Sequence, residues 1–198
     1  LNTILAVVPA MRSQGGGRIV NITSIGGAIA VPHLLPYTAS KFALVGLSDG
    51  LRAELARDGI RVTTVIPGLM RTGSYVNAFF KGHHRSEYAW FSISSALPLF
   101  STSVEKAARQ ILEAGRYGDP VLVITWQAKV LIWLNSLFPG LTSAFQKLAN
   151  LLLPRPDLSV GQQNFTGWES QSAWSPSLLT RFGDLEIDRT NQASGVER

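Results

Sequence analysis

The chain contains no cysteine among its 198 residues. It can therefore form neither a disulfide framework nor a thiolate metal site. This absence is compatible with a reducing compartment, and we expect a cytoplasmic protein. Only three histidines are present, and the adjacent pair His83 and His84 lies in a stretch that reads as a loop. Adjacent loop histidines are usually solvated, so we expect no metal site.

A long uninterrupted hydrophobic run is also missing. The apolar stretch 126–153 is broken by Pro139 and Gly140, and neither half reaches the roughly 20 apolar residues that a membrane-spanning helix needs. Three interpretations of 126–153 remain open. The segment could contact a membrane peripherally, which would make the cytoplasmic protein membrane-associated. It could instead form the roof of an apolar substrate pocket, or a contact with another helix or subunit.

The amino end has no basic leader before its apolar run, and Pro9 interrupts that run. We therefore read no secretion signal. The sequence starts with Leu1 rather than Met, within what looks like an apolar helix. We expect from this that further sequence precedes it.

Charge of one sign is not concentrated along the chain. The formal net charge is +5 and the pI is about 9.9, but basic and acidic residues alternate, and the only tight basic cluster is 81–85. A groove that binds nucleic acid combines a basic stripe with aromatic side chains. No such stripe is present, so we expect no nucleic-acid partner.

The first half of the chain has a strand, helix, strand pattern. A β-branched run at 18–23 predicts a buried strand, the period of 37–57 predicts a helix, and 60–66 predicts a second strand that ends at Pro67 and Gly68. Such a crossover predicts a parallel sheet in an α/β fold. Ligands of such sheets bind at the carboxyl ends of the strands.

The predicted helix 37–57 has two distinct faces. Four leucines form one stripe, and a row of small residues forms another. The leucines are Leu44, Leu47, Leu51 and Leu55, and the small residues are Ala39, Ala43, Gly46 and Gly50. The first face suits a sheet and the second a closely approaching helix, so we expect a homo-oligomer.

The second half is more varied. Residues 73–100 mix aromatic, glycine and basic residues, which predicts a long substrate loop with short helical pieces. A helix is expected from Ser103 to about Ala114, a third strand at 121–125, and two apolar helical pieces in 126–153. The polar stretch 154–198 predicts an extended or disordered tail, with at most a turn of helix near 177–181.

Ser24, Tyr37 and Lys41 form a candidate catalytic group. Tyr37 and Lys41 are four residues apart on the predicted helix, so their side chains lie on one face. A phenol with an ordinary pKa of about 10 is a poor acid or base at neutral pH, and a cation close by favours the phenolate. Ser24 follows the first strand and could hold a carbonyl oxygen by donating a hydrogen bond. Each residue type alone is more often a packing or surface residue.

Taken together, these motifs are more specific. Ser24, then Tyr37-Thr38-Ala39-Ser40-Lys41, then Pro67-Gly68-Leu69-Met70-Arg71-Thr72 closely resembles the carboxyl-terminal half of the short-chain dehydrogenase/reductase family. The resemblance covers about 1–125 and implies a Rossmann-like, doubly wound parallel sheet. It implies that Tyr37 is the general acid/base, that Lys41 tunes it and holds the nicotinamide ribose, and that Ser24 orients the substrate. It also implies cofactor contacts from Pro67, Gly68, Leu69 and Thr72.

The family's glycine-rich phosphate turn and its selector of NAD or NADP are not found. Gly15–Gly17 precedes a strand instead of linking a strand to a helix, and Asn2 does not match the catalytic asparagine. The resemblance therefore implies a fragment that holds the last three of seven strands. We expect an exposed edge on the strand near Ile19, and weak or no binding of NAD or NADP by the chain alone.

The sequence supports two hypotheses about function. The first is an NAD(P)-dependent oxidoreductase that interconverts an alcohol and a carbonyl compound, with an apolar small molecule as substrate. The alternative is a catalytically silent fragment that acts only in oligomerisation or membrane association.

Overall fold

The computed structural model describes residues 1–155 and 163–192. It divides into two compact units, which are described separately. Unit 1 comprises Leu1–Gly68 and Ala107–Gln146, and unit 2 comprises Leu69–Lys106 and Lys147–Arg198.

Unit 1 is built on a three-stranded parallel sheet in the order β1-β2-β6. The strands are β1 (Gly17–Ile22), β2 (Ile60–Pro67) and β6 (Val121–Ile124). Gly17 pairs with Ile60, and Pro67 pairs with Ile124. The three strands run the same way, so their carboxyl ends meet at one edge, as the crossover pattern predicted.

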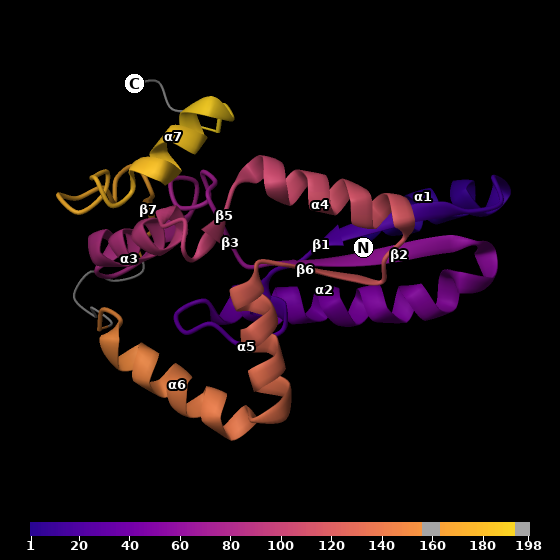
Figure 1. Ribbon diagram of the computed structural model, residues 1–198, viewed down its shortest axis with the longest axis horizontal. Helices are drawn as coiled ribbons and strands as arrows, with labels where there is room; N and C mark the ends of the chain where they lie inside the picture. Colours follow the sequence, from indigo (N-terminus) through magenta and orange to yellow (C-terminus); the bar gives the residue numbers. More distant parts are fainter. Residues whose placement is uncertain (156–162, 193–198) are drawn as a thin grey trace. The chain divides into compact units, whose positions relative to one another are not determined.

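Helices cover both faces of this sheet. They are α1 (Asn2–Ser13), α2 (Leu35–Glu54) with the 3-10 turn η2 (Leu55–Asp58), and α4 (Val104–Tyr117). Helix α5 (Trp126–Leu137) follows β6, and α6 (Pro139–Leu152) follows α5 and continues past Gln146 into unit 2. Figure 1 shows α2 and α4 on opposite sides of the strands. On the α4 side, a Cβ on Gly115 would lie 2.9 Å from a methyl group of Val20, so this glycine lets α4 approach β1 closely.

The hydrophobic core of unit 1 lies between α1, α2 and the first two strands. Its buried members are Ile4, Val8, Ile19, Leu55, Ile60 and Val62, with Met11, Leu47 and Leu51 packed against them. The leucine stripe predicted for α2 therefore faces the sheet. The small row of α2 is exposed, and a Cβ on Gly46 or Gly50 would meet no atom within 4 Å.

β1 is an edge strand of the sheet within the described residues. Two of its apolar side chains, Val20 and Ile22, are exposed. The edge that the family resemblance implied is thus present, and it is apolar.

Unit 2 combines small two-stranded sheets with two helices. β3 (Leu69–Met70) pairs in parallel with β5 (Ser101–Thr102), and β4 (Phe79–Phe80) pairs antiparallel with β7 (Phe165–Thr166). The helices are α3 (His84–Ala96) and α7 (Arg181–Arg189). Tyr75, Val76, Tyr88 and Ile187 form the core, with Phe80, Phe91 and Trp168 against it.

Two predictions for this part are wrong. Residues 73–100 contain the 13-residue helix α3 rather than short pieces only. Its buried face includes Ser92 and Ser95 as well as Tyr88, so hydrophobic periodicity does not reveal it. The predicted tail is folded over 163–192, where β7, Trp168 and α7 belong to unit 2, whereas 156–162 and 193–198 lie outside the described residues.

The phenol of Tyr75 links the two chain segments that make up unit 2. Tyr75 donates a 2.8 Å hydrogen bond to Asp184 Oδ1, and Thr180 donates a 2.7 Å bond to the other carboxylate oxygen. Burial, with this carboxylate beside it, raises the pKa of Tyr75 far above its ordinary value. Tyr75 is therefore a neutral core residue.

None of the helices in the described part of the chain is long and apolar enough to cross a bilayer.

Candidate active site

Ser24, Tyr37 and Lys41 all belong to unit 1 and lie beside the carboxyl end of β1. Ser24 directly follows the strand and caps the 3-10 turn η1 (Ile25–Gly27), where its Oγ accepts a 3.1 Å hydrogen bond from Gly26 N–H. This bond uses an oxygen lone pair and leaves the hydroxyl hydrogen to donate. Ser24 can therefore still donate to a carbonyl oxygen.

Gly26 brings the serine and the tyrosine together. A Cβ on Gly26 would lie 3.1 Å from Tyr37 Cε1 and 3.7 Å from Ser24 Oγ. The edge of the phenol ring next to its hydroxyl-bearing carbon and the Ser24 hydroxyl thus flank the same glycine. The sequence motif did not single out Gly26, although its place two residues after the serine was a usable signal.

Lys41 lies one helical turn beyond Tyr37 on α2. Its Nζ is 5.5 Å from the centroid of the Tyr37 ring and donates a 3.3 Å hydrogen bond to the Ile22 carbonyl. An ammonium has three donors, so this bond leaves two for other acceptors. The side chain of Tyr37 is 41% exposed, and its ring is open to a ligand.

The turn after β2 lies at the same edge of the sheet. Gly68 N–H donates a 3.1 Å bond to Ile124 O, and a Cβ on Gly68 would overlap the Thr125 hydroxyl. The proximity of Thr125 is thus sufficient to require a glycine at position 68, whether or not a ligand binds there. Thr125 has a positive φ of 79°, which is a strained conformation for a β-branched residue, and its hydroxyl caps α5 by accepting from Ala128 N–H.

Leu69 and Thr72 belong to unit 2. Leu69 begins β3, and the Thr72 hydroxyl is hydrogen-bonded to Ser74 Oγ at 2.6 Å. Their predicted contact with a cofactor stays a prediction.

Side chains of α5 and α6 form hydrogen bonds with the loop between η1 and α2. Asn135 Nδ2 donates to the carbonyl of Ala28 at 3.4 Å, and Gln146 Nε2 donates to the carbonyl of Ala30 at 2.7 Å. These two contacts join the apolar helices to the segment that connects Ser24 with Tyr37. Nothing in the sequence pattern predicts them, because amide side chains carry no periodic signal.

The contact between His84 and Ser170 is structural. His84 Nδ1 is 3.0 Å from Ser170 Oγ, but Ser170 is fully buried and donates its proton to Thr166 O. Burial lowers the pKa of His84, and Arg85 adds to this effect. Within 1–155 and 163–192, no cluster of three acidic or histidine residues could hold a metal ion.

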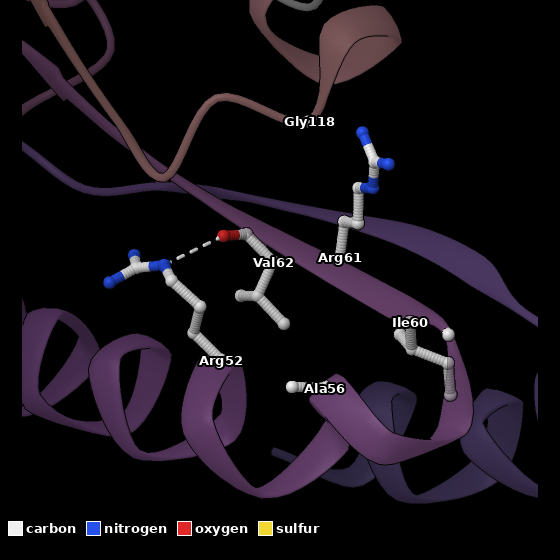
Figure 2. Close-up of a pocket in the computed structure, with 7 residues that line it drawn as sticks. Arg52, Ala56, Ile60, Arg61, Val62 and Gly118 are labelled. Carbon is white, nitrogen blue, oxygen red and sulfur yellow. Dashed lines mark hydrogen bonds between the residues drawn. The ribbon is translucent and has the colours of Figure 1, made fainter.

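Figure 2 shows a shallow cavity at the amino ends of β2 and β6, the sheet edge opposite Ser24. Arg52 lines it and donates from Nε to Val62 O at 3.0 Å and from Nη2 to Thr64 Oγ1 and Pro120 O. Arg61 points toward Gly118 and donates to Tyr117 O. Both arginines hold the backbone or a core threonine in place.

Comparisons with known proteins show which proteins this chain is similar to. Residues 1–79 match the family model described as short chain dehydrogenase. The chain is similar to a protein of Anopheles gambiae named Dehydrogenase/reductase SDR family protein 7-like, with 34% identity over 68% of this chain and 41% of that protein. It is also 49% identical to Dehydrogenase/reductase SDR family member 4 of Rattus norvegicus, over 35% of this chain and 25% of that protein. The chain thus spans less than half the length of both relatives.

Solved structures show the same fold. A short-chain dehydrogenase from Streptomyces avermitilis matches with a TM-score of 0.55 and 28% identity, over 75% of this chain and 57% of its own. One from Burkholderia cenocepacia, solved in complex with NADP, matches with a TM-score of 0.56 and 24% identity, over 73% and 53%.

Proposed function

Because the chain belongs to the short-chain dehydrogenase/reductase family, we propose that it carries the proton-transfer site of an oxidoreductase that interconverts an alcohol and a ketone or aldehyde. One observation carries this proposal. The Tyr37 ring edge and the Ser24 hydroxyl flank Gly26, with the Lys41 ammonium 5.5 Å from the ring centroid. A phenol, a hydroxyl donor and a cation are the groups that a carbonyl oxygen needs for protonation.

Each residue has a defined part in this proposal. Ser24 donates a hydrogen bond to the substrate oxygen and orients it. Tyr37 donates a proton to that oxygen in reduction and accepts one in oxidation. Lys41 keeps a positive charge beside the phenol, which stabilises the phenolate form while the proton is away.

The residues also fit a nicotinamide dinucleotide. The two N–H donors of Lys41 that Ile22 leaves unused suit the hydroxyls of a ribose, and Tyr37 is exposed beside them. We propose that Pro67, Gly68, Leu69 and Thr72 complete the contacts. When bound, NAD or NADP supplies or accepts the hydride.

We further propose an apolar substrate and a homo-oligomer. Part of the aromatic content of 73–100 is not available to a substrate. Its members Tyr75, Phe80, Tyr88 and Phe91 pack on one another. Phe79 and Trp90 remain exposed. The exposed small row on α2 supports an oligomer contact.

The test is Tyr37→Phe in the complete protein. We expect turnover of alcohols with NAD(P) to fall by about 10²–10⁴-fold, because the general acid/base is removed. Cofactor binding, followed by fluorescence, should change little. Tyr117→Phe on α4, an exposed tyrosine, is the matched control.

The alternative, a catalytically silent protein that acts in oligomerisation or membrane association, is favoured by the exposed apolar side chains of α5 and α6. It predicts no turnover in the unchanged protein. It also predicts lipid or partner binding that persists when Tyr37 and Lys41 are both replaced.

A further inference from the structure

α5 carries an apolar stripe that points away from the protein. Its members recur at i, i+4, i+7 and i+11, and are Trp126, Val130, Trp133 and Leu137. Their exposed fractions are 64%, 47%, 72% and 55%. This spacing places all four on one side of a helix. Large apolar side chains on that side face solvent instead of a core.

The opposite side of α5 contacts the rest of unit 1. Ala128 is 1% exposed, and Asn135 donates to the Ala28 carbonyl. The helix is therefore inverted relative to an ordinary surface helix, because its polar amide faces the protein and its largest apolar residues face outward.

α6 repeats the arrangement. Leu141, Phe145, Leu148 and Leu152 recur at the same spacing, and each is about half exposed or more. On the anchored side, Thr142 is buried and donates to Asn135 Oδ1 at 2.7 Å, and Gln146 donates to Ala30 O. Two consecutive helices thus present apolar stripes, while Asn135, Thr142 and Gln146 make hydrogen bonds within the protein.

The charges on this segment have one sign. No acidic residue occurs between Asp119 and Asp157, whereas Lys129 and Lys147 lie on the two helices and Arg155 follows them. Both lysines are exposed. Lys129 lies three residues after Trp126 and four before Trp133, so it borders the α5 stripe. Tryptophans beside a lysine at the border of an apolar stripe are typical of helices that lie in a membrane interface.

We propose that the α5 apolar face, defined as Trp126, Val130, Trp133 and Leu137 with the bordering Lys129, lies in the headgroup region of a bilayer that contains anionic lipids. A second copy of the face is the less favourable occupant, because self-association would bring lysines of both copies together without an acidic partner on this segment. An anionic surface complements the same charges. Neither helix could span the bilayer, so the contact is peripheral.

The experiment is co-flotation of the full chain with vesicles of phosphatidylcholine, with and without phosphatidylserine. We expect flotation that is stronger with phosphatidylserine. Trp126→Ser/Trp133→Ser should lower binding by about tenfold or more, because interfacial binding scales with the buried apolar area. The matched control Trp90→Ser/Trp174→Ser removes two exposed tryptophans elsewhere and should bind as the unchanged chain does.

A second pair of variants tests the charge. Lys129→Gln should reduce the phosphatidylserine preference by about fivefold. Lys106→Gln, an exposed lysine on α4, removes the same charge and should keep the preference. Circular dichroism establishes that each variant is folded.

Three outcomes would overturn the proposal: no flotation with either lipid, equal loss in the tryptophan variant and its control, or a vesicle-free dimer that dissociates in Trp126→Ser/Trp133→Ser. The last would assign the face to a second copy. Vesicle binding involves no turnover, so its failure is distinguishable from failure of the proposed oxidoreductase activity.

Discussion

At the scale of single residues, Gly26 leaves room for the Tyr37 ring. A Cβ at position 26 would lie 3.1 Å from Tyr37 Cε1, which is closer than ordinary van der Waals contact. The Tyr37 side chain is partly exposed and can yield. A larger residue at 26 would therefore move the ring rather than unfold the chain.

We expect Gly26→Ala to lower turnover by about ten- to hundredfold, because a displacement of less than 1 Å at a proton-transfer group disturbs its alignment. Gly27→Ala gives the contrast. There a Cβ would meet the backbone carbonyl of Lys41 at 2.7 Å, so stability should fall by about 1–3 kcal/mol. Activity assays and urea unfolding of both variants separate the two effects, and full activity in Gly26→Ala would refute this role.

At the scale of elements, Arg52 joins α2 to two strands. Its guanidinium donates to Val62 O and Thr64 Oγ1 on β2 and to Pro120 O just before β6, and Figure 2 shows its reach from the helix to Val62. A planar guanidinium serves several acceptors at fixed angles, which an ammonium does not.

We expect Arg52→Met to lower the free energy of unfolding by about 1–3 kcal/mol, because the carbonyl of buried Val62 and the hydroxyl of buried Thr64 lose a donor. Arg52→Lys should recover only part of this loss. Arg57→Met, an exposed position on η2, should change stability by less than about 0.5 kcal/mol. Urea denaturation measures all three, and equal stability of Arg52→Met and Arg57→Met would contradict the role given to Arg52.

At the scale of the whole molecule, the carboxyl-terminal segment completes unit 2. Ile187 and Trp168 pack on Tyr75 and Tyr88, and Asp184 accepts the Tyr75 hydrogen bond. A Cβ on Gly167 would overlap the carbonyl of Tyr75. The segment is therefore packed directly against the backbone of residues about a hundred positions earlier.

We expect a chain that ends at Arg155 to expose the Tyr75 and Tyr88 cluster. Near-ultraviolet circular dichroism should weaken and binding of an apolar dye should rise, because the cluster loses its cover. Leu178→Ser, at an 84% exposed position in the same segment, is the control and should change neither signal. A truncated chain with unchanged spectra would support the disordered tail that the sequence predicted.

The sequence by itself determined the parallel sheet and the spacing of Ser24, Tyr37 and Lys41. It could do so because strands, an amphipathic helix and i, i+4 pairs are local patterns. The same locality explains the wrong predictions: α3 buries serines, and the 163–192 segment folds only through distant contacts such as Tyr75 with Asp184. Neither leaves a periodic signal.

Only the tertiary structure decided what the helices face. It showed that Gly26 lies between the Tyr37 ring and Ser24, and that the close approach of Thr125 requires a glycine at 68. It also showed that Asn135 of α5 and Gln146 of α6 point inward. Hydrophobic spacing gives the faces of a helix but not which one meets the protein. That choice depends on contacts between residues far apart in the chain, here Asn135 with Ala28 and Gln146 with Ala30, and these exist only once the chain has folded.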